Sequence, residues 1–417
     1  MNASTLDTVR QSFMHIPEND TRSKIGPRSF VIALITAMVD DSPHRSIANL
    51  RRQFASSLGQ ILARSSFWQR LSSKRLTSFL TQSIREIVSK IAVELDVAID
   101  ILSILGVKAV YLIDSSSVTL PKDAKGDFPA PRSNVIPAAV KCHFCWNLLS
   151  GVGQWCCITD GTTHDRKGFP PINMLKGALI IFDLGYWDYQ LLADLMNQGC
   201  FFLSRVKKNA LIEITGVSDR LEWKAPLGKN LFSMNWNKFR GNIIEMIGTV
   251  DLGDMEYAEM RVVGFWNQPA KKYHWYVTNL SIAGNLIYPL YRIRWQIELV
   301  FKAGKSSLNF ADIPSSNFNI IINLMLASII TNLIAQPLSR MVLERATKEV
   351  QSAISVQRAA FVFVHIASEL RNYLISGAAR AADILIKKLG LFVTELIDPN
   401  FKNRPTTLKT LQLLAKN

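Results

Sequence analysis

Two short, almost entirely apolar segments limit the folds open to this chain more than any other feature of its sequence. Residues 107–113 and 178–182 have the length and composition of strands that are buried on both faces of a sheet. Asp114 follows the first segment directly and Asp183 follows the second. In sheets covered by helices, bound molecules and ions collect at strand ends, so both carboxylates are candidates for binding one. Because a lone aspartate there is usually only a turn or helix cap, a functional role requires a third group.

The segments that follow these strands predict a mixed sheet flanked by helices. Strand patterns at 139–149 and 154–159 are separated by a hairpin turn at 150–153. A helix pattern at 189–196 then precedes a strand pattern at 201–206. Strands in succession, followed by strands that alternate with a helix, are typical of an α/β fold.

Residues 207–272 differ from the segments on either side. They are richer in polar residues, glycine and tryptophan, and they contain short alternating segments at 242–250 and 260–265. We interpret them as a β-rich insertion. The strand pattern at 275–278 then resumes the main sheet, and helices follow it to a basic C-terminal tail.

The charge of the N-terminal region favours DNA as a partner. The chain has a formal charge of +15, and apolar residues recur at helical spacing between 29 and 105. Residues 42–85 contain eight cations and no carboxylate, whereas solvated helices usually mix both signs. Residues 46–71, with Gly59 near the turn, are a weak match to a helix-turn-helix. The eight cations are Arg45, Arg51, Arg52, Arg64, Arg70, Lys74, Arg75 and Arg85.

One uncharged stretch, residues 317–339, is long enough to span a bilayer. Four amide side chains recur through it, and each would be costly in lipid. We therefore predict a core helix of a protein that does not enter the membrane. The four amides belong to Asn319, Asn323, Asn332 and Gln336.

The third carboxylate is Glu298, in a segment with the pattern of an amphipathic helix. If residues 291–305 form one helix, steps of about 100° place Tyr291, Arg294, Glu298 and Lys305 on one face, with Lys302 beside them. Apolar residues, among them Ile297 and Val300, occupy the opposite face. An ordinary solvated helix with a Glu298–Lys302 pair would explain this pattern alone, but not the two aspartates at strand ends.

Phosphodiester chemistry would explain all three carboxylates. Cleavage by water and transesterification by a 3′-hydroxyl both require an activated oxygen nucleophile and a stabilised leaving oxygen, which two Mg²⁺ ions can provide. Mg²⁺ prefers carboxylate oxygens. Arg294, Lys302 and Lys305 would then bind neighbouring phosphates of the DNA.

Three blocks of sequence resemble DDE transposases of bacterial insertion sequences, in the family numbered four. The run from Tyr291 to Ser306 is similar to that family's Tyr-Arg-Glu-Lys signature. The block from Asp114 to Pro121 resembles its first-aspartate motif, with Ser116 where Thr is more usual, and the block from Asp183 to Asp188 resembles its Asp-x-Gly-Tyr motif. The pairs Asp160-Gly161 and His164-Asp165 between them are also similar to it.

The resemblance implies an RNase H-like catalytic core with a β-rich insertion between Asp183 and Glu298. It implies that Asp114, Asp183 and Glu298 bind two Mg²⁺ ions, for which Mn²⁺ can substitute, and that Tyr291, Arg294 and Lys305 contact the terminal strand of the element. Relatives cut both strands through a hairpin with a flipped base stacked on an aromatic residue, for which an insertion tryptophan or Trp187 is a candidate. They act as homodimers that hold two DNA ends. The resemblance also implies a bacterial cytoplasmic protein that is associated with the nucleoid when it binds DNA.

The sequence thus predicts five regions. They are a helical DNA-binding region at 1–105, the first part of the catalytic core at 106–206, the β-rich insertion at 207–272, the second part of the core at 273–348 and a helical C-terminal region with a basic tail at 349–417.

Several other residues are weaker candidates. Cys142 and Cys145 have the spacing of half a zinc site, but a strand would send them to opposite faces, and the five cysteines suggest reduced thiols. We expect His164 to be a structural or capping residue. Three tryptophans are expected in the core of the insertion, and three further aspartates compete with the catalytic pair, Asp188 most seriously. These residues are Trp223, Trp236, Trp266, Asp160, Asp165 and Asp188.

Three functions remain open on the sequence alone. The first is a transposase that cuts DNA at the ends of a mobile element and joins those ends to a target. The second is a transposase-derived repressor that binds DNA without cutting it, which would have no need for the carboxylates. The third is a structure-selective nuclease on the same core, which cuts without joining.

Overall fold

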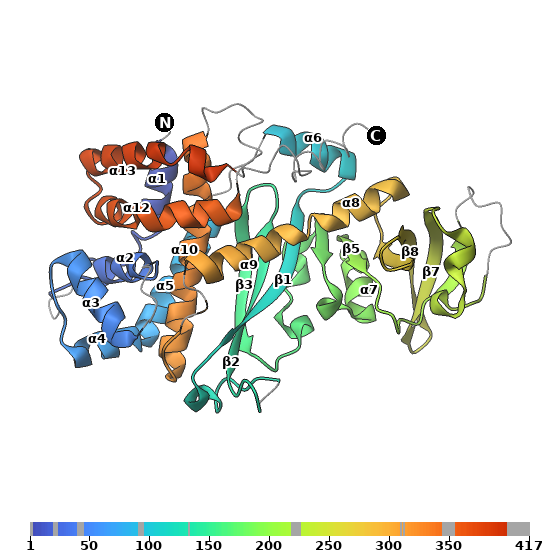
Figure 1. Cartoon of the computed structure of the whole chain (residues 1–417), viewed down its shortest axis with the longest axis horizontal. Helices are drawn as coiled ribbons and strands as arrows, with labels where there is room; N and C mark the ends of the chain where they lie inside the picture. Colours follow the sequence, from blue (N-terminus) through green and yellow to red (C-terminus); the bar gives the residue numbers. More distant parts are fainter. Residues whose placement is uncertain are drawn as a thin grey trace.

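A mixed sheet forms the centre of the protein in the computed structural model (Figure 1), which describes residues 3–19, 24–39, 46–90, 96–131, 134–217, 227–308, 311, 313–343 and 355–397. Nine strands of these residues make one sheet, in the order β3-β2-β1-β4-β5-β9-β8-β7-β6. Pairing is parallel between β1 and β4 and between β4 and β5, and antiparallel elsewhere. The strands are β1 Val110–Thr119, β2 Ala139–Asn147, β3 Val152–Asp160, β4 Leu179–Phe182, β5 Phe201–Arg205, β6 Glu213–Val217, β7 Ile244–Gly253, β8 Glu256–Asn267 and β9 Lys272–Thr278.

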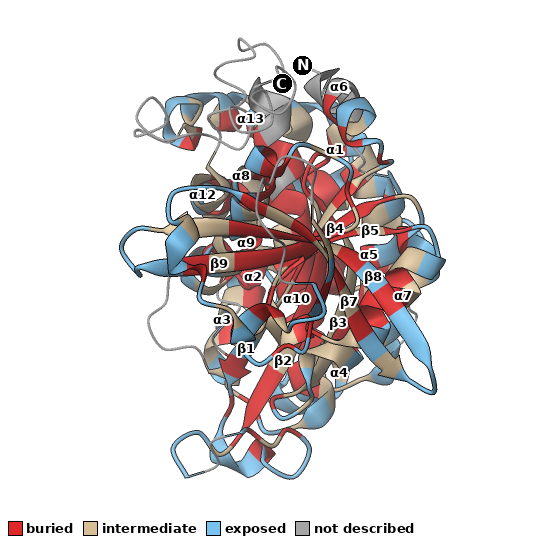
Figure 2. Cartoon of the chain, turned by 90° about the vertical axis from the view of Figure 1, so that its right-hand side faces the viewer, coloured by how far each residue is buried: buried red, intermediate tan, exposed pale blue. Residues whose placement is uncertain are grey.

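The apolar strands form the centre of this sheet because side chains from both of their faces are buried. All four residues of β4 are buried, and they alternate between two separate hydrophobic cores. Ile181 belongs to the first core, and Ile180 belongs to the second core. Figure 2 shows buried residues concentrated in the central strands and exposed residues toward the outer ends of the elements. The predicted α/β class, a mixed sheet flanked by helices, is confirmed. The turn between β2 and β3 is at 148–151, two residues earlier than predicted.

The strands of the expected insertion extend the main sheet. β8 pairs with β9, and β7 and β6 continue the sheet to its edge. Trp236 is buried in the core there, with its ring centroid 4.9 Å from that of Trp275, as expected for an insertion tryptophan. Trp266 is partly buried against the same core, and Trp223 lies outside the described residues.

Most of the helices pack around one half of the sheet, at the end of the molecule opposite β7, whereas α7 packs against β5, β7 and β8 (Figure 1). The N-terminal helices are α1 Ala3–Gln11, α2 Pro27–Ala37, α3 Ile47–Leu58, α4 Arg64–Leu71, α5 Lys74–Lys90 and α6 Asp96–Leu105, and the later ones are α7 Tyr189–Asn197, α8 Ile287–Arg292, α9 Trp295–Ser307, α10 Phe318–Leu343, α12 Val356–Ser376 and α13 Ala379–Leu391.

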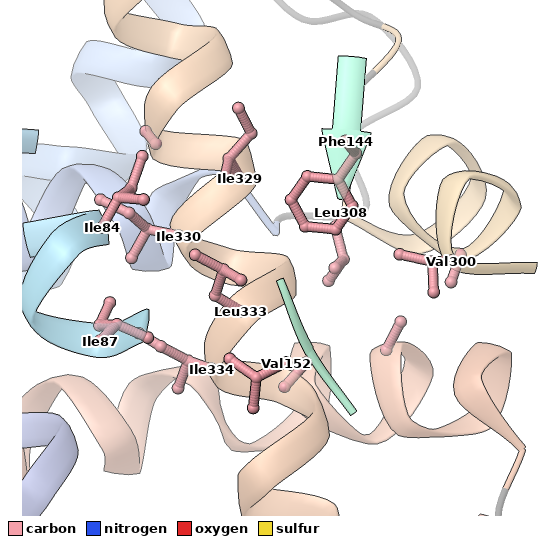
Figure 3. Packing of buried hydrophobic residues seen from close by; sticks show 14 of the residues in the cluster. Ile84, Ile87, Phe144, Val152, Val300, Leu308, Ile329, Ile330, Leu333 and Ile334 are labelled. Atoms are coloured by element: carbon pink, nitrogen blue, oxygen red, sulfur yellow. The ribbon is translucent and has the colours of Figure 1, made fainter. Parts of the chain in front are cut away.

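The uncharged helix α10 is the centre of the helical part. Figure 3 shows Ile330, Leu333 and Ile334 of α10 between Ile84 and Ile87 of α5 on one side and Val152 of β3 on the other. α10 alone, among the described helices, is long and apolar enough to cross a membrane, but 78% of its most apolar window is buried by other parts of this protein. The prediction of a core helix therefore agrees with the structure.

The basic N-terminal segment contains the expected helix pair, α3 and α4. Gly59 ends α3 with a φ of 67°, a left-handed conformation that glycine adopts without strain. The cap of α3 is Ser46, whose side chain accepts from the Asn49 N–H. Arg45 lies outside the described residues.

Two of the eight cations of this segment bind backbone carbonyl groups of the protein itself. Arg51 donates to the Leu62 carbonyl at 2.7 Å, and Arg70 donates to the Ile25 carbonyl at 2.8 Å while it stacks on Phe30. The exposed cations among the eight are Arg52, Arg64, Lys74, Arg75 and Arg85.

Candidate active site

Asp114 and Asp183 lie side by side on neighbouring parallel strands. The parallel ladder between β1 and β4 ends at the pair Ile113–Phe182. Asp114 is the next residue after Ile113, and Asp183 is the next residue after Phe182. Both follow a residue of the second core, so alternation directs both carboxylates to the face of the sheet that α9 covers.

The expectation that β1 ends before Asp114 is wrong. β1 continues to Thr119 because residues 114–119 remain paired with β2, up to Thr119 opposite Ala139. Asp114 is therefore paired with β2 along one edge of β1. Along the other edge, it lies just beyond the end of the parallel ladder with β4. Asp183 does follow its strand directly, as predicted.

Backbone N–H groups fix both carboxylates. The Ser115 N–H donates to Asp114 Oδ1 at 2.8 Å, and the Gly185 N–H donates to Asp183 Oδ1 at 2.7 Å. Asp183 thereby caps a short 3-10 turn, Leu184–Tyr186. The second oxygen of Asp114 forms an ion pair with Arg294.

Residues 291–305 do not form the single helix that the sequence predicts. α8 ends at Arg292 and α9 begins at Trp295, and the join is tighter than an α-helix because the Arg294 N–H donates to the Tyr291 carbonyl, three residues back. From Trp295 onward the predicted apolar face is observed, with Ile297 and Val300 buried in the first core.

Arg294 joins Asp114 and Glu298 across this join. Its Nη1 donates to Asp114 Oδ2 at 2.9 Å, and its Nη2 donates to Glu298 Oε1. The guanidinium is largely buried, with 15% of the side chain exposed, so both contacts are little screened by water. One cation thus holds a strand carboxylate and a helix carboxylate together.

Asp114 is within electrostatic reach of both Asp183 and Glu298. Burial raises the pKa of Asp114, Arg294 lowers it, and the charges of Asp183 and Glu298 raise it, so that the pKa lies at about 6. Asp114 therefore gives up its proton less readily than an ordinary aspartate.

A cleft of about 420 Å³ opens beside this set. Lys302 is exposed at the cleft, and Lys305 lies beside β1, where its Nζ donates to the Ser117 carbonyl at 2.9 Å. The cleft is lined by Asp114, Ser115, Ser116, Glu298, Phe301, Lys302, Lys305 and Ser306.

The aromatic residues near the site differ in how far they are exposed. Tyr291 is half-buried against Tyr276, with ring centroids 5.0 Å apart. Trp187, a candidate for stacking a base, is buried in the second core. Trp295 was not singled out from the sequence, although it is 57% exposed next to Arg294. Its position directly after Arg294 in the signature is the signal that could have identified it.

The competing aspartates have other partners. Asp188 caps α7 by accepting from the Leu191 N–H at 2.8 Å, and Asp160 accepts from the N–H and hydroxyl groups of Thr162 and Thr163, which lower its pKa to about 2. Asp165 lies closer to the site and accepts from the Ser115 hydroxyl.

The histidine and cysteine predictions agree with the structure. His164 caps a short 3-10 turn by accepting from the Arg166 N–H. Cys142 and Cys145 are buried in opposite cores, on opposite faces of β2, so they cannot form half of one zinc site. Within the described ranges, no three carboxylate, imidazole or thiol side chains are grouped closely enough to form a metal site as they stand.

Comparisons with known proteins identify the family of the chain. The family model of the transposase DDE domain matches residues 106–333, more than half of the chain. The chain is also similar to the transposase for insertion sequence element IS1151 of Clostridium perfringens, with 27% identity over 240 residues, 47% of this chain. The match spans 50% of that relative. With its sheet, its paired aspartates and this match, the chain belongs to the DDE transposase family.

Proposed function

We propose that the protein is a transposase that cuts DNA at the ends of an insertion sequence and joins those ends to target DNA. One observation carries the proposal. Asp114 and Glu298 line one cleft together with Lys302 and Lys305, and Asp183 follows the strand that pairs with the strand of Asp114. A cleft with this composition suits a phosphodiester and its neighbouring phosphates. The assignment to the family numbered four stays a prediction.

The three carboxylates fit a hard divalent cation. Their oxygens are the ligands that Mg²⁺ prefers, and the mutual effect of their charges on Asp114 supports a shared site. Two bound Mg²⁺ or Mn²⁺ ions would supply activation of the nucleophile and stabilisation of the leaving oxygen. The residues proposed to hold them are Asp114, Asp183 and Glu298.

The cations and aromatic groups at the cleft would position the DNA. Lys302 is exposed and can reach a phosphate directly, whereas Arg294 must leave the two carboxylates before it can do so. The half-buried Tyr291 is kept as a proposed contact to the terminal strand, beside Lys305. Trp295 is the better placed aromatic for stacking an unpaired base.

The rest of the molecule fits a synaptic role. The exposed cations of 46–85 would contact DNA outside the cleft, and residues 106–206 and 273–348 would form the catalytic core around the insertion at 207–272. We propose a homodimer that holds two DNA ends in the bacterial cytoplasm. The carboxylate set argues against a pure repressor, because a repressor has no use for it.

A cleavage and strand-transfer assay with labelled element ends tests the proposal. Glu298→Gln should abolish cutting in Mg²⁺ or Mn²⁺ while it leaves binding of the same DNA nearly unchanged. Asp188→Asn is the matched control, because asparagine can still cap α7. Cutting that survives in Glu298→Gln would refute the site. Cutting without any joined product would identify a nuclease, and binding without cutting in the unmodified protein would identify a repressor.

A further inference from the structure

Asp165 lies on the opposite face of β1 from Asp114. Its carboxylate receives the Ser115 hydroxyl at 2.9 Å and the Lys141 Nζ at 3.1 Å, both at Oδ1. Ser115 and the buried His143 are paired across β1 and β2 and belong to this face. Lys141 is itself held by the Thr163 carbonyl at 2.7 Å. Asp165 is therefore a fixed, charge-balanced group at the back of the strand that carries Asp114.

The same carboxylate also contacts the turn that carries Asp183. A Cβ placed on Gly185 would lie 2.5 Å from Asp165 Oδ2 and 3.0 Å from Asp183 Oδ1. Only a residue without a side chain allows both carboxylates to lie this close to residue 185, because a Cβ would occupy the space between them and the backbone. Asp165 thus sets how closely this turn packs behind the site.

These two contacts involve a specific pair of residues. Ser115 and Gly185 are the residues whose N–H groups hold Asp114 Oδ1 and Asp183 Oδ1. One side chain therefore contacts both of the residues whose N–H groups orient Asp114 and Asp183, Ser115 through its hydroxyl and Gly185 through its Cα. Asp188 and Asp160 differ in this respect. Each accepts hydrogen bonds from N–H groups two or three residues later in the chain, and Asp188 also pairs with Arg166.

We propose that Asp165 is a positioning residue that holds the Ser115 and Gly185 backbone so that Asp114 and Asp183 can share a divalent cation. The proposal rests on the proposed function, because it assumes that these two carboxylates are metal ligands. Groups that orient metal ligands without touching the metal typically change metal affinity by 10- to 100-fold.

Mn²⁺ binding to the full chain without DNA, followed by the electron paramagnetic resonance signal of free Mn²⁺ at pH 8, tests the proposal. Asp165→Ala and Gly185→Ala should weaken Mn²⁺ binding by about tenfold or more. Ser115→Ala removes one hydroxyl and keeps the N–H, so it should weaken binding by less. Asp165→Asn keeps an oxygen that can accept from Ser115, so it should retain more affinity than Asp165→Ala. Asp188→Asn, the control, should bind Mn²⁺ as the unmodified protein does.

The outcomes separate this proposal from the proposed function. Asp114→Asn should lose Mn²⁺ binding if the strand carboxylates are the metal site, and unchanged binding would refute that function. If Asp114→Asn loses binding while Asp165→Ala, Gly185→Ala and Ser115→Ala keep it, Asp165 has no positioning role. Should Asp165→Ala fail to fold, as judged by its thermal transition, Ser115→Ala and Gly185→Ala decide alone. An Asp165→Asn variant no better than Asp165→Ala would contradict the hydrogen-bond role.

Discussion

The Thr77 hydroxyl donates a hydrogen bond of 2.7 Å to Asn323 Oδ1, across 246 residues of chain. The Asn323 amide nitrogen in turn donates to the Leu71 carbonyl at 2.8 Å and the Ser73 carbonyl at 3.2 Å. One buried amide of α10 therefore satisfies the end of α4 and the start of α5. This network joins the basic N-terminal helices to the helix at the centre of the protein.

Replacing Asn323 by leucine should destabilise the protein by about 2–4 kcal/mol, because one hydroxyl and two carbonyl groups lose a partner in a buried place. Urea unfolding measured by circular dichroism gives the difference. Asn319→Leu, a half-buried position of the same helix, is the control and should cost less than about 1 kcal/mol. Equal effects of the two substitutions would show that the Thr77–Asn323 network contributes little.

Asp114→Asn should make the metal-free protein more stable at pH 8, although it removes activity. The folded pKa of about 6 lies above the ordinary value of 3.8, mainly because of burial. The stabilising effect of the bound proton is therefore full below about pH 4 and is lost as the pH rises through 6. The asparagine variant does not lose it, so its advantage should grow by up to about 3 kcal/mol between pH 4 and pH 8.

Chemical unfolding in EDTA at a series of pH values measures this difference. Arg294→Gln gives a second check, because Arg294 lowers the pKa of Asp114. Its loss should move the pH at which stability declines above 6. A stability difference between Asp114→Asn and the unmodified protein that does not depend on pH would contradict the shifted pKa.

Lys302→Ala should weaken DNA binding evenly across sequences and lower the slope of log affinity against log salt concentration by about one. Lys302 is exposed at the cleft, so it can contact a phosphate without rearrangement. Fluorescence anisotropy with an element end between 50 and 300 mM salt measures the slope. Lys388→Ala is the control, because Lys388 is already paired with Glu369 at 2.8 Å on the helices α12 and α13. An unchanged slope for Lys302→Ala would remove this residue from the DNA contacts.

The sequence predicts the fold class because buried central strands have a distinctive composition. Segments such as 178–182 contain no polar residue, and this pattern is explained by burial on both faces. The sequence does not predict that β1 continues through Asp114 to Thr119. Residues 114–117 are polar, as at a strand end, and their pairing depends on β2, which follows some twenty residues later.

The three carboxylates of the candidate site are singled out from their positions after apolar strand segments and on a helix face, and their role stays a prediction. The break between α8 and α9 has no signal such as proline or glycine at residues 291–295. The contact of Arg294 with Asp114 spans 180 residues and depends on tertiary packing. The role we propose for Asp165 depends in the same way on contacts with Ser115 and Gly185, which no spacing reveals.

His143→Gln should flatten the acid limb of stability. His143 is completely buried between the Tyr186 hydroxyl and the Thr159 hydroxyl, and burial lowers its pKa from 6.5 to about 4. Between these values the unfolded chain binds a proton that the folded protein does not, so the free energy of unfolding decreases as the pH falls from 6.5 toward 4. This decrease is up to about 3 kcal/mol for one histidine.

Glutamine removes the titration, and although it also costs stability at pH 8, the curve of its unfolding free energy between pH 7 and pH 4 should be flatter by that amount. His164→Gln, which changes an exposed capping histidine, should keep the original slope. If both variants keep that slope, proton uptake by buried His143 does not cause the acid limb.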